Sequence, residues 1–243
     1  MAIPSATPNL SFNDTRVLNA LFDPETLPSS VAKSKESAAI DTSLPPHPSI
    51  SASQISTLES QQNDIIRRVS SSSSSDEIAS AIQELDRMVT LWPNYPSAYI
   101  NRAMLRRLKL EYQIRASQHI FTQPTFAIEP LFTDLSRAIH LALPSTSATA
   151  PVSTYQAKIL RTAYSHRAYL YLKAAETETE TETRLQGLEK SELEELASKD
   201  FAAAARYGDE VAREMSVRTN PYAKMCGAIV RNALREEMNE TGQ

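Results

Sequence analysis

Few side chains in this chain of 243 residues have the spacing that catalysis or metal binding requires. Asp134 and His140 share a predicted helix, but at six positions apart their side chains point in different directions. The single cysteine, Cys226, excludes an internal disulfide and is interpreted as a small buried hydrophobe. The paired spacing of metal ligands is missing among the four histidines, which are His47, His119, His140 and His166. The sequence therefore predicts a protein that is not an enzyme and has no metal site and no cofactor.

The glycine content also limits the possible functions and folds. Only four glycines occur in the chain, and they are dispersed, whereas a phosphate-binding loop needs several at fixed spacing. Tight hairpin turns also favour glycine, and the periodic segments are instead filled with the helix formers Ala, Leu, Glu and Arg. We therefore expect an all-α fold and no nucleotide-dependent catalysis.

Charge and hydropathy restrict the partners and the location. A net charge of −4 argues against binding to nucleic acid or to an anionic membrane, because both require a dominant basic face. The start, "MAIPSATPNLSF", lacks the basic and apolar regions of a signal peptide, and no run approaches the roughly 18 apolar residues of a membrane span. We expect a cytoplasmic monomer, with access to the nucleus left open.

The N-terminal part of the chain is predicted to be a short helix on a flexible linker. Within residues 1–28, the spacing of Val17, Leu18, Leu21 and Phe22 places all four on one face of an amphipathic helix. Residues 29–53 are rich in Ser, Pro and Ala, which predicts a disordered linker. Two arrangements of the helix remain open, because the linker would let it either dock in a groove of its own chain or cap the first repeat.

A helical pattern recurs between residues 54 and 208. Ser74 and Glu77 have the spacing of a capping box, which predicts that a helix begins at the end of a serine tract. Two further segments each place an alanine four residues after a tyrosine, at Tyr99 and Tyr164, so that a partner helix can approach closely. Three helices carry a stripe of small and large apolar residues: Ala81, Leu85 and Met88; Leu131, Leu135 and Ala138; and Ala197, Phe201 and Ala204.

This pattern resembles the tetratricopeptide repeat, a helical hairpin of about 34 residues. The resemblance implies an all-α, right-handed superhelix of three degenerate repeats over residues 54–208. Two hairpin tips must be extended, because the segments that follow Tyr99 and Tyr164 are longer than the repeat allows. The second tip contains "ETETETETR", which is interpreted as a solvated loop. Residues 209–243 are predicted to form C-terminal capping helices, with a start at Pro221 and an apolar stripe of Met225, Ile229 and Val230.

Four stretches extend the resemblance to one family. "VLNALFDPETLP", "SAYINRAMLRRL", "KDFAAAARYG" and "NPYAKMC" are similar, in this order, to the tetratricopeptide repeat protein 36 family. The resemblance implies a non-enzymatic adaptor or scaffold, with links to Hsp70-type chaperones and to the protection of a tyrosine-degrading enzyme. We therefore expect a protein client or a peptide as the partner.

The first helices of the repeats are expected to line a concave binding groove. Such a groove would be polar, partly aromatic and mildly basic, and would suit a peptide better than a small metabolite. Its predicted peptide-binding residues are Asn63, Arg67, Asn101, Met104, Arg107, His166, Tyr169 and Lys173, with Ile66, Ile100 and Ser165 beside them.

A co-chaperone that binds a C-terminal peptide tail is the alternative. Repeats that hold a terminal carboxylate use two asparagines and several basic residues, and Asn63 and Asn101 stand where the asparagines would. Three basic positions are instead occupied by Glu59, Thr162 and His166. An acidic residue there would repel a carboxylate, so the sequence favours the general adaptor.

Overall fold

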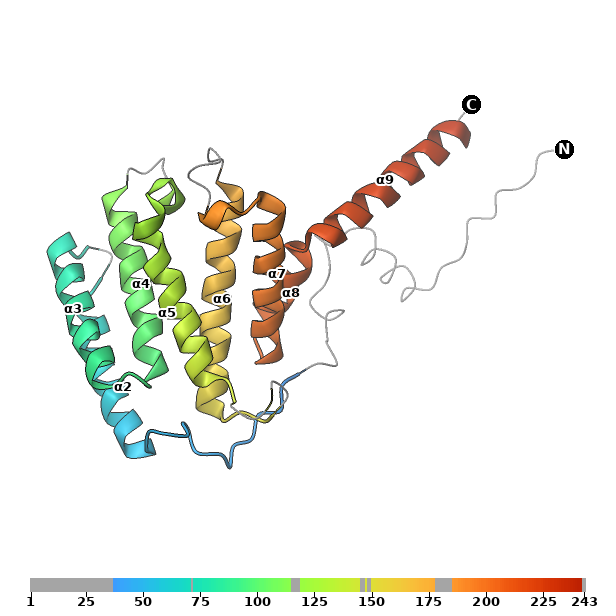
Figure 1. The fold of residues 1–243 in the computed structure, drawn as a ribbon. Helices are drawn as coiled ribbons and strands as arrows, with labels where there is room; N and C mark the ends of the chain where they lie inside the picture. The colour runs from blue at the N-terminus through green and yellow to red at the C-terminus, as the bar shows by residue number, and fades with distance from the viewer. Residues whose placement is uncertain are drawn as a thin grey trace.

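The computed structural model describes residues 37–241, except residues 71, 115–118, 145–146, 148–149 and 178–184. The predicted all-α class is confirmed, with consecutive helices packed side by side in a row (Figure 1). The helices are α2 (Ala52–Arg67), α3 (Ser75–Leu91), α4 (Pro96–Gln113), α5 (Thr125–Ala142), α6 (Thr154–Glu176), α7 (Lys190–Arg206), α8 (Glu210–Arg218) and α9 (Pro221–Thr241), with 3-10 turns η1 (Ile120–Thr122) and η3 (Leu185–Gly187). The N-terminal stripe around Leu18 and most of the Glu/Thr tip lie outside the described residues.

Serine capping boxes set the starts of α2, α3 and α6. In α3 the Ser74 hydroxyl accepts the backbone N–H of Glu77, and the Glu77 carboxylate accepts the backbone N–H of Ser74. The same reciprocal arrangement joins Ser51 to Gln54 in α2 and Ser153 to Gln156 in α6. Each box satisfies backbone donors that have no partner inside the helix. The helix start predicted at the end of the serine tract is therefore confirmed.

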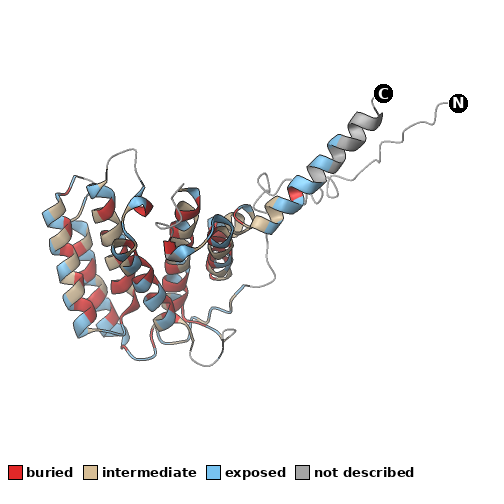
Figure 2. Cartoon of the chain, turned by 45° about the horizontal axis from the view of Figure 1, so that its top comes forward, coloured by how far each residue is buried: buried red, intermediate tan, exposed pale blue. Residues whose placement is uncertain are grey.

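The predicted stripes of small and large residues form the interior, as Figure 2 shows by the buried inner sides of the helices. Leu85, Leu135 and Ala197 are completely buried at the centres of α3, α5 and α7. Ala103 and Ala168 are buried in α4 and α6, where a larger side chain would hold the neighbouring helix away. The packing is that of a tetratricopeptide-like helical repeat.

Residues 37–50, which we call the strap, differ from the predicted disordered linker. The backbone N–H of Ala38 donates to the carbonyl of Arg206 at 2.8 Å, and that of Asp41 donates to the carbonyl of Val152 at 2.9 Å. Ile50 and His47 are buried at 5% and 4% exposure. Because the loops of the repeats supply backbone partners and the core receives Ile50, this Ser- and Pro-rich stretch packs along the base of α6 and α7 (Figure 1).

The predicted capping role belongs to α8 and not to α9. Ala212 of α8 is buried against α7, and the Ser198 hydroxyl donates to the carbonyl of Ser216 at 2.6 Å. Since α8 already covers the last hairpin, α9 projects away from the row, with Met225 and Ile229 exposed (Figure 1). Cys226 is exposed as well, so its interpretation as a buried hydrophobe was wrong. Among the described helices, none combines the length and the apolarity needed to cross a membrane.

Candidate binding groove

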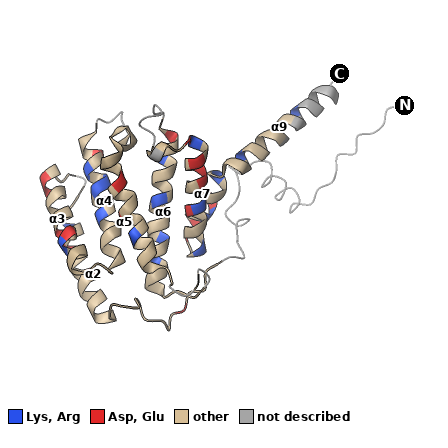
Figure 3. Ribbon diagram, viewed as in Figure 1, with Lys and Arg blue, Asp and Glu red and all other residues tan. Residues whose placement is uncertain are grey.

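The candidate groove lies between α4 and α6, the first helices of two successive hairpins. The two helices contact each other directly, and η1 from the extended α4–α5 tip packs against α4. Lys and Arg are frequent on α4 and α6, whereas Asp and Glu gather on α7 (Figure 3). This distribution gives the first helices the basic character expected from the sequence.

Three of the predicted peptide-binding residues come together as one cluster. The Arg107 guanidinium of α4 lies 5.5 Å from the ring centroid of Tyr169 on α6, and the Lys173 ammonium lies 5.8 Å from the same centroid. A tyrosine face attracts cations through its quadrupole, so the ring holds both side chains near one place. We call Arg107, Tyr169 and Lys173 the cationic cluster.

Within the described residues, neither cation of the cationic cluster forms an ion pair with a buried side chain. Arg107 has Glu111 at 3.5 Å, four residues along its own helix, and the Arg107 Nε makes no hydrogen bond among the described residues. Lys173 has Glu176 at 2.6 Å on its own helix, and both acidic side chains are more than 40% exposed. Exposed pairs within one helix contribute about 0.3–0.5 kcal/mol. A carboxylate from a partner would therefore displace them at little cost.

A pocket of about 230 Å³ opens beside the cationic cluster. Its apolar wall includes Ile120 and Phe121 of η1, which are buried at 7% and 3% exposure. The extended tip therefore builds one side of the groove, a role that the length of the tip alone did not indicate. The pocket is lined by Arg107, Glu111, Ile114, His119, Ile120, Phe121, Tyr169, Leu170 and Lys173.

His166 belongs to this part of the groove as a neutral residue. Burial, with a smaller contribution from the positive charge of Arg107, lowers the pKa of His166 to about 4. At neutral pH the imidazole is therefore uncharged and offers a hydrogen bond in place of a positive charge. The positive charge here comes from Arg107 and Lys173.

A negative charge lies near the other ends of α4 and α6. The carboxylate of Glu59 on α2 acts on Tyr95 and Tyr155, at the N-terminal ends of α4 and α6. Burial, with a smaller contribution from the negative charge of Glu59, raises the pKa of Tyr95 to about 12. A negative charge at Glu59 thus acts near the N-terminal ends of α4 and α6, whereas Arg107 and Lys173 lie toward their C-terminal ends.

Four other predicted groove residues lie apart from the cationic cluster. Asn101 is half-buried and Met104 is 40% exposed on α4, and no described contact joins either to the cationic cluster. Asn63 and Arg67 are exposed on α2, where Arg67 reaches only Asp64, at 4.0 Å.

The residues expected beside the groove lie in different environments. Ile100 is buried at 4% exposure and belongs to the core, so its placement in the groove was wrong. Ser165 donates to the carboxylate of Asp209 at 2.5 Å and is thereby held by the segment before α8. Ile66 packs partly buried against the core.

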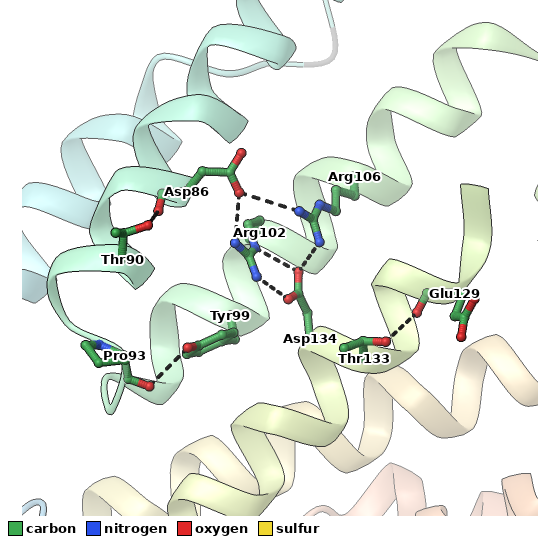
Figure 4. A network of polar contacts seen from close by, with 9 residues as sticks. All are labelled: Asp86, Thr90, Pro93, Tyr99, Arg102, Arg106, Glu129, Thr133 and Asp134. Carbon is green, nitrogen blue, oxygen red and sulfur yellow. Dashed lines mark hydrogen bonds and ion pairs between the residues drawn. The ribbon is translucent and has the colours of Figure 1, made fainter. Parts of the chain in front are cut away.

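Sequence reasoning missed a network of charges between the helices (Figure 4). Arg102 donates to both oxygens of Asp134 on α5, at 2.5 and 3.0 Å, and Arg106 donates to the same carboxylate at 2.8 Å. Both arginines also reach Asp86 on α3, at 2.8 and 3.5 Å. Asp134 is only 2% exposed, so the network holds three helices together.

The next hairpin repeats this contact. Arg167 of α6 donates to both oxygens of Asp200 on α7, at 2.6 and 2.8 Å. Arg102 and Arg167 each follow a tyrosine by three residues and lie over its ring, at 5.4 and 5.7 Å from the centroid. Both helices share the sequence spacing Tyr-x-x-Arg-Ala, and this repeat could have revealed the two arginines. In the structure the spacing indicates an ion pair that holds helices together.

The chain aligns over most of its length with known proteins. The L-tyrosine degradation gene cluster protein hmgX of Aspergillus fumigatus is 45% identical over 97% of this chain and 96% of its own length. Tetratricopeptide repeat protein 36 is 25% identical in Xenopus tropicalis, over 95% of this chain and 90% of that protein, and 25% identical in Homo sapiens, over 90% of each. No family model and no solved structure matches the chain.

Proposed function

Because the chain belongs to the family of the L-tyrosine degradation gene cluster protein hmgX, we propose that it is a non-enzymatic adaptor of tyrosine catabolism. In this proposal the groove between α4 and α6 binds a segment of a client protein, and the client is an enzyme of tyrosine degradation that the adaptor stabilises. The names of the relatives, a gene cluster protein and a tetratricopeptide repeat protein, agree with a role other than catalysis.

The cationic cluster is the observation that carries the proposal. Arg107 and Lys173 lie on one tyrosine ring, next to a pocket with an apolar wall, and their present partners are exposed side chains of the same helices. Cations that are already ordered lose little entropy on binding, and a peptide carboxylate can replace Glu111 and Glu176. An extended segment with an acidic residue and an apolar residue fits this end of the groove.

A chaperone tail with a free C-terminal carboxylate is the second candidate. It is favoured by the same two cations and by Asn101, whose half-buried amide has no partner among the described residues. The negative charge of Glu59 at the other end of the groove opposes it, because that end would repel further acidic residues of such a tail. An internal segment of a folded client avoids this repulsion when it presents a basic residue toward Glu59.

Affinity capture from a lysate of cells grown on L-tyrosine tests the proposal. Full-length protein is expected to retain an enzyme of tyrosine degradation, identified by mass spectrometry. The triple variant Arg107→Ala/Tyr169→Ala/Lys173→Ala should retain at least tenfold less, since the contacts near the pocket are lost.

The matched control removes two cations from the same helices outside the pocket, as Lys109→Ala/Arg161→Ala. This variant should capture the client like the unchanged protein. Equal capture by the triple variant would reject the groove as the binding site, and loss of capture in both variants would indicate a general effect of charge. A synthetic peptide that binds with a free but not with an amidated C-terminus would favour the chaperone tail instead.

A further inference from the structure

The α9 helix carries an apolar stripe that the described part of the chain leaves uncovered. Tyr222, Met225 and Ile229 are 60%, 55% and 60% exposed, and Cys226 is exposed between them. Their spacing places all four on one face of the helix. The opposite face turns Gly227, which is buried, toward the rest of the chain. A stripe of this kind on a projecting helix marks a site of contact.

The strap determines where the preceding 36 residues of the chain leave the fold. It runs from α2 past the start of α6, where Asp41 meets Val152, and reaches the end of α7, where Ala38 meets Arg206. The α8 helix begins only four residues after Arg206, and α9 follows it directly. The strap therefore carries the N-terminal segment to the end of the row at which α9 projects, and away from α2.

The N-terminal segment contains an apolar stripe of its own. Val17, Leu18, Leu21 and Phe22 share one face of the helix predicted there, and 15 residues separate Phe22 from Ala38. A flexible connection of that length spans roughly 20 Å on average, while α9, with 21 residues, is about 31 Å long. The segment can therefore reach the stripe on α9 without strain.

We propose that the N-terminal helix covers the exposed face of α9, with Val17, Leu18, Leu21 and Phe22 packed on Tyr222, Met225, Cys226 and Ile229. The occupant is this segment of the same chain because a short tether gives an effective concentration in the millimolar range, far above that of a second copy at micromolar concentration. The arrangement covers the apolar face of α9 and leaves the groove between α4 and α6 open.

Cys226 is the only cysteine of the chain and lies inside the stripe, so its reactivity reports directly on the contact. The rate at which a polyethylene glycol maleimide modifies the full-length protein is the measured quantity. In the variant Leu18→Asp/Leu21→Asp the rate is expected to rise about tenfold, which corresponds to a millimolar effective concentration acting on a contact with a Kd of about 0.1 mM.

The control Asn19→Asp/Ala20→Asp adds the same charge to the opposite face of the predicted helix and should react like the unchanged protein. Equal rates in all three proteins would overturn the proposal. Protection of Cys226 that increases with protein concentration would also overturn it, because the cover would then be a second copy. None of the substituted residues belongs to the groove between α4 and α6, so the outcome is separable from client binding.

Discussion

The two tyrosine–arginine helices, α4 and α6, follow one plan but differ in how their arginines are paired. In α4, Arg102 shares the buried Asp134 with Arg106, and Asp86 of the preceding hairpin contacts both arginines. In α6, Arg167 has the single carboxylate of Asp200 and a hydrogen bond to the Ser136 hydroxyl at 2.9 Å.

The difference arises at two positions. In the hairpin before each helix, Arg102 meets the Asp86 carboxylate, whereas Arg167 meets the Ser136 hydroxyl. Four residues after Arg102 stands Arg106, whereas four residues after Arg167 stands Tyr171, whose ring packs on Phe132 of α5 with centroids 5.0 Å apart. Burial raises the pKa of Asp200 despite the guanidinium of Arg167. Two copies of a repeat can thus share one backbone arrangement, while the arginines of one copy pair with two carboxylates and the arginine of the other pairs with one.

Asp200→Asn should be the most destabilising single change in either network. It leaves the Arg167 guanidinium buried without a carboxylate, and breaking a buried pair typically costs about 3–5 kcal/mol. Asp134→Asn should cost about half as much, because Asp86 still contacts Arg102 and Arg106. Urea unfolding at pH 7 measures both free energies.

The double variant Asp86→Asn/Asp134→Asn tests the reason for that order. It should lose clearly more stability than the sum of its single variants, since only then do Arg102 and Arg106 lack any carboxylate. If the two substitutions are additive, or if Asp134→Asn costs as much as Asp200→Asn, the second carboxylate does not protect α4.

The dependence of stability on pH tests the environment of His166, which lies where α4 and α6 contact each other. In the unfolded chain His166 binds a proton near pH 6.5, but in the folded protein its pKa is about 4. Stability from this group is therefore complete above pH 6.5 and is lost as the pH falls toward 4, by roughly 2–3 kcal/mol. The difference in unfolding free energy between the unchanged protein and His166→Gln should shrink by this amount between pH 7.5 and pH 4. A constant difference would contradict the assignment.

The smallest effect is expected when α4 is made to resemble α6. Arg106→Met places an apolar side chain where α6 has Tyr171, and it should cost about 1 kcal/mol or less, because Arg102 alone still donates to both oxygens of Asp134. Thermal unfolding beside the control Lys109→Met provides the measurement. A loss above 2 kcal/mol would show that Arg102 does not compensate for Arg106.

The helices of the fold could be predicted because their signals are local. Ser74 and Glu77 cap α3 through contacts within four residues, and the stripe around Leu85 identifies its buried face. The peptide-binding groove stays a prediction, although three of its residues, Arg107, Tyr169 and Lys173, lie close together. The placement of Ile100 in the groove was wrong, because a shift of one position on a helix turns a side chain by about 100°.

Contacts distant in the sequence could not be predicted. To predict the ion pair between Arg167 and Asp200, one must know how the two helices are rotated relative to each other. In the sequence alone, neither residue can be distinguished from a charged residue on the surface. The strap has the composition of a disordered segment, and its order comes from carbonyl groups at Val152 and Arg206 that local sequence cannot reveal. The prediction that α9 forms a cap failed for a similar reason. The spacing of its apolar residues identifies the apolar face of the helix but not the element that this face contacts.

The strap also has a consequence for the way the protein is made. Helical repeats usually gain their structure from neighbours, so each hairpin can form soon after it leaves the ribosome. The strap is synthesised before all of them, yet its partners at Val152 and Arg206 are made more than a hundred residues later. The earliest part of the described chain can therefore complete its contacts only after α7 has emerged.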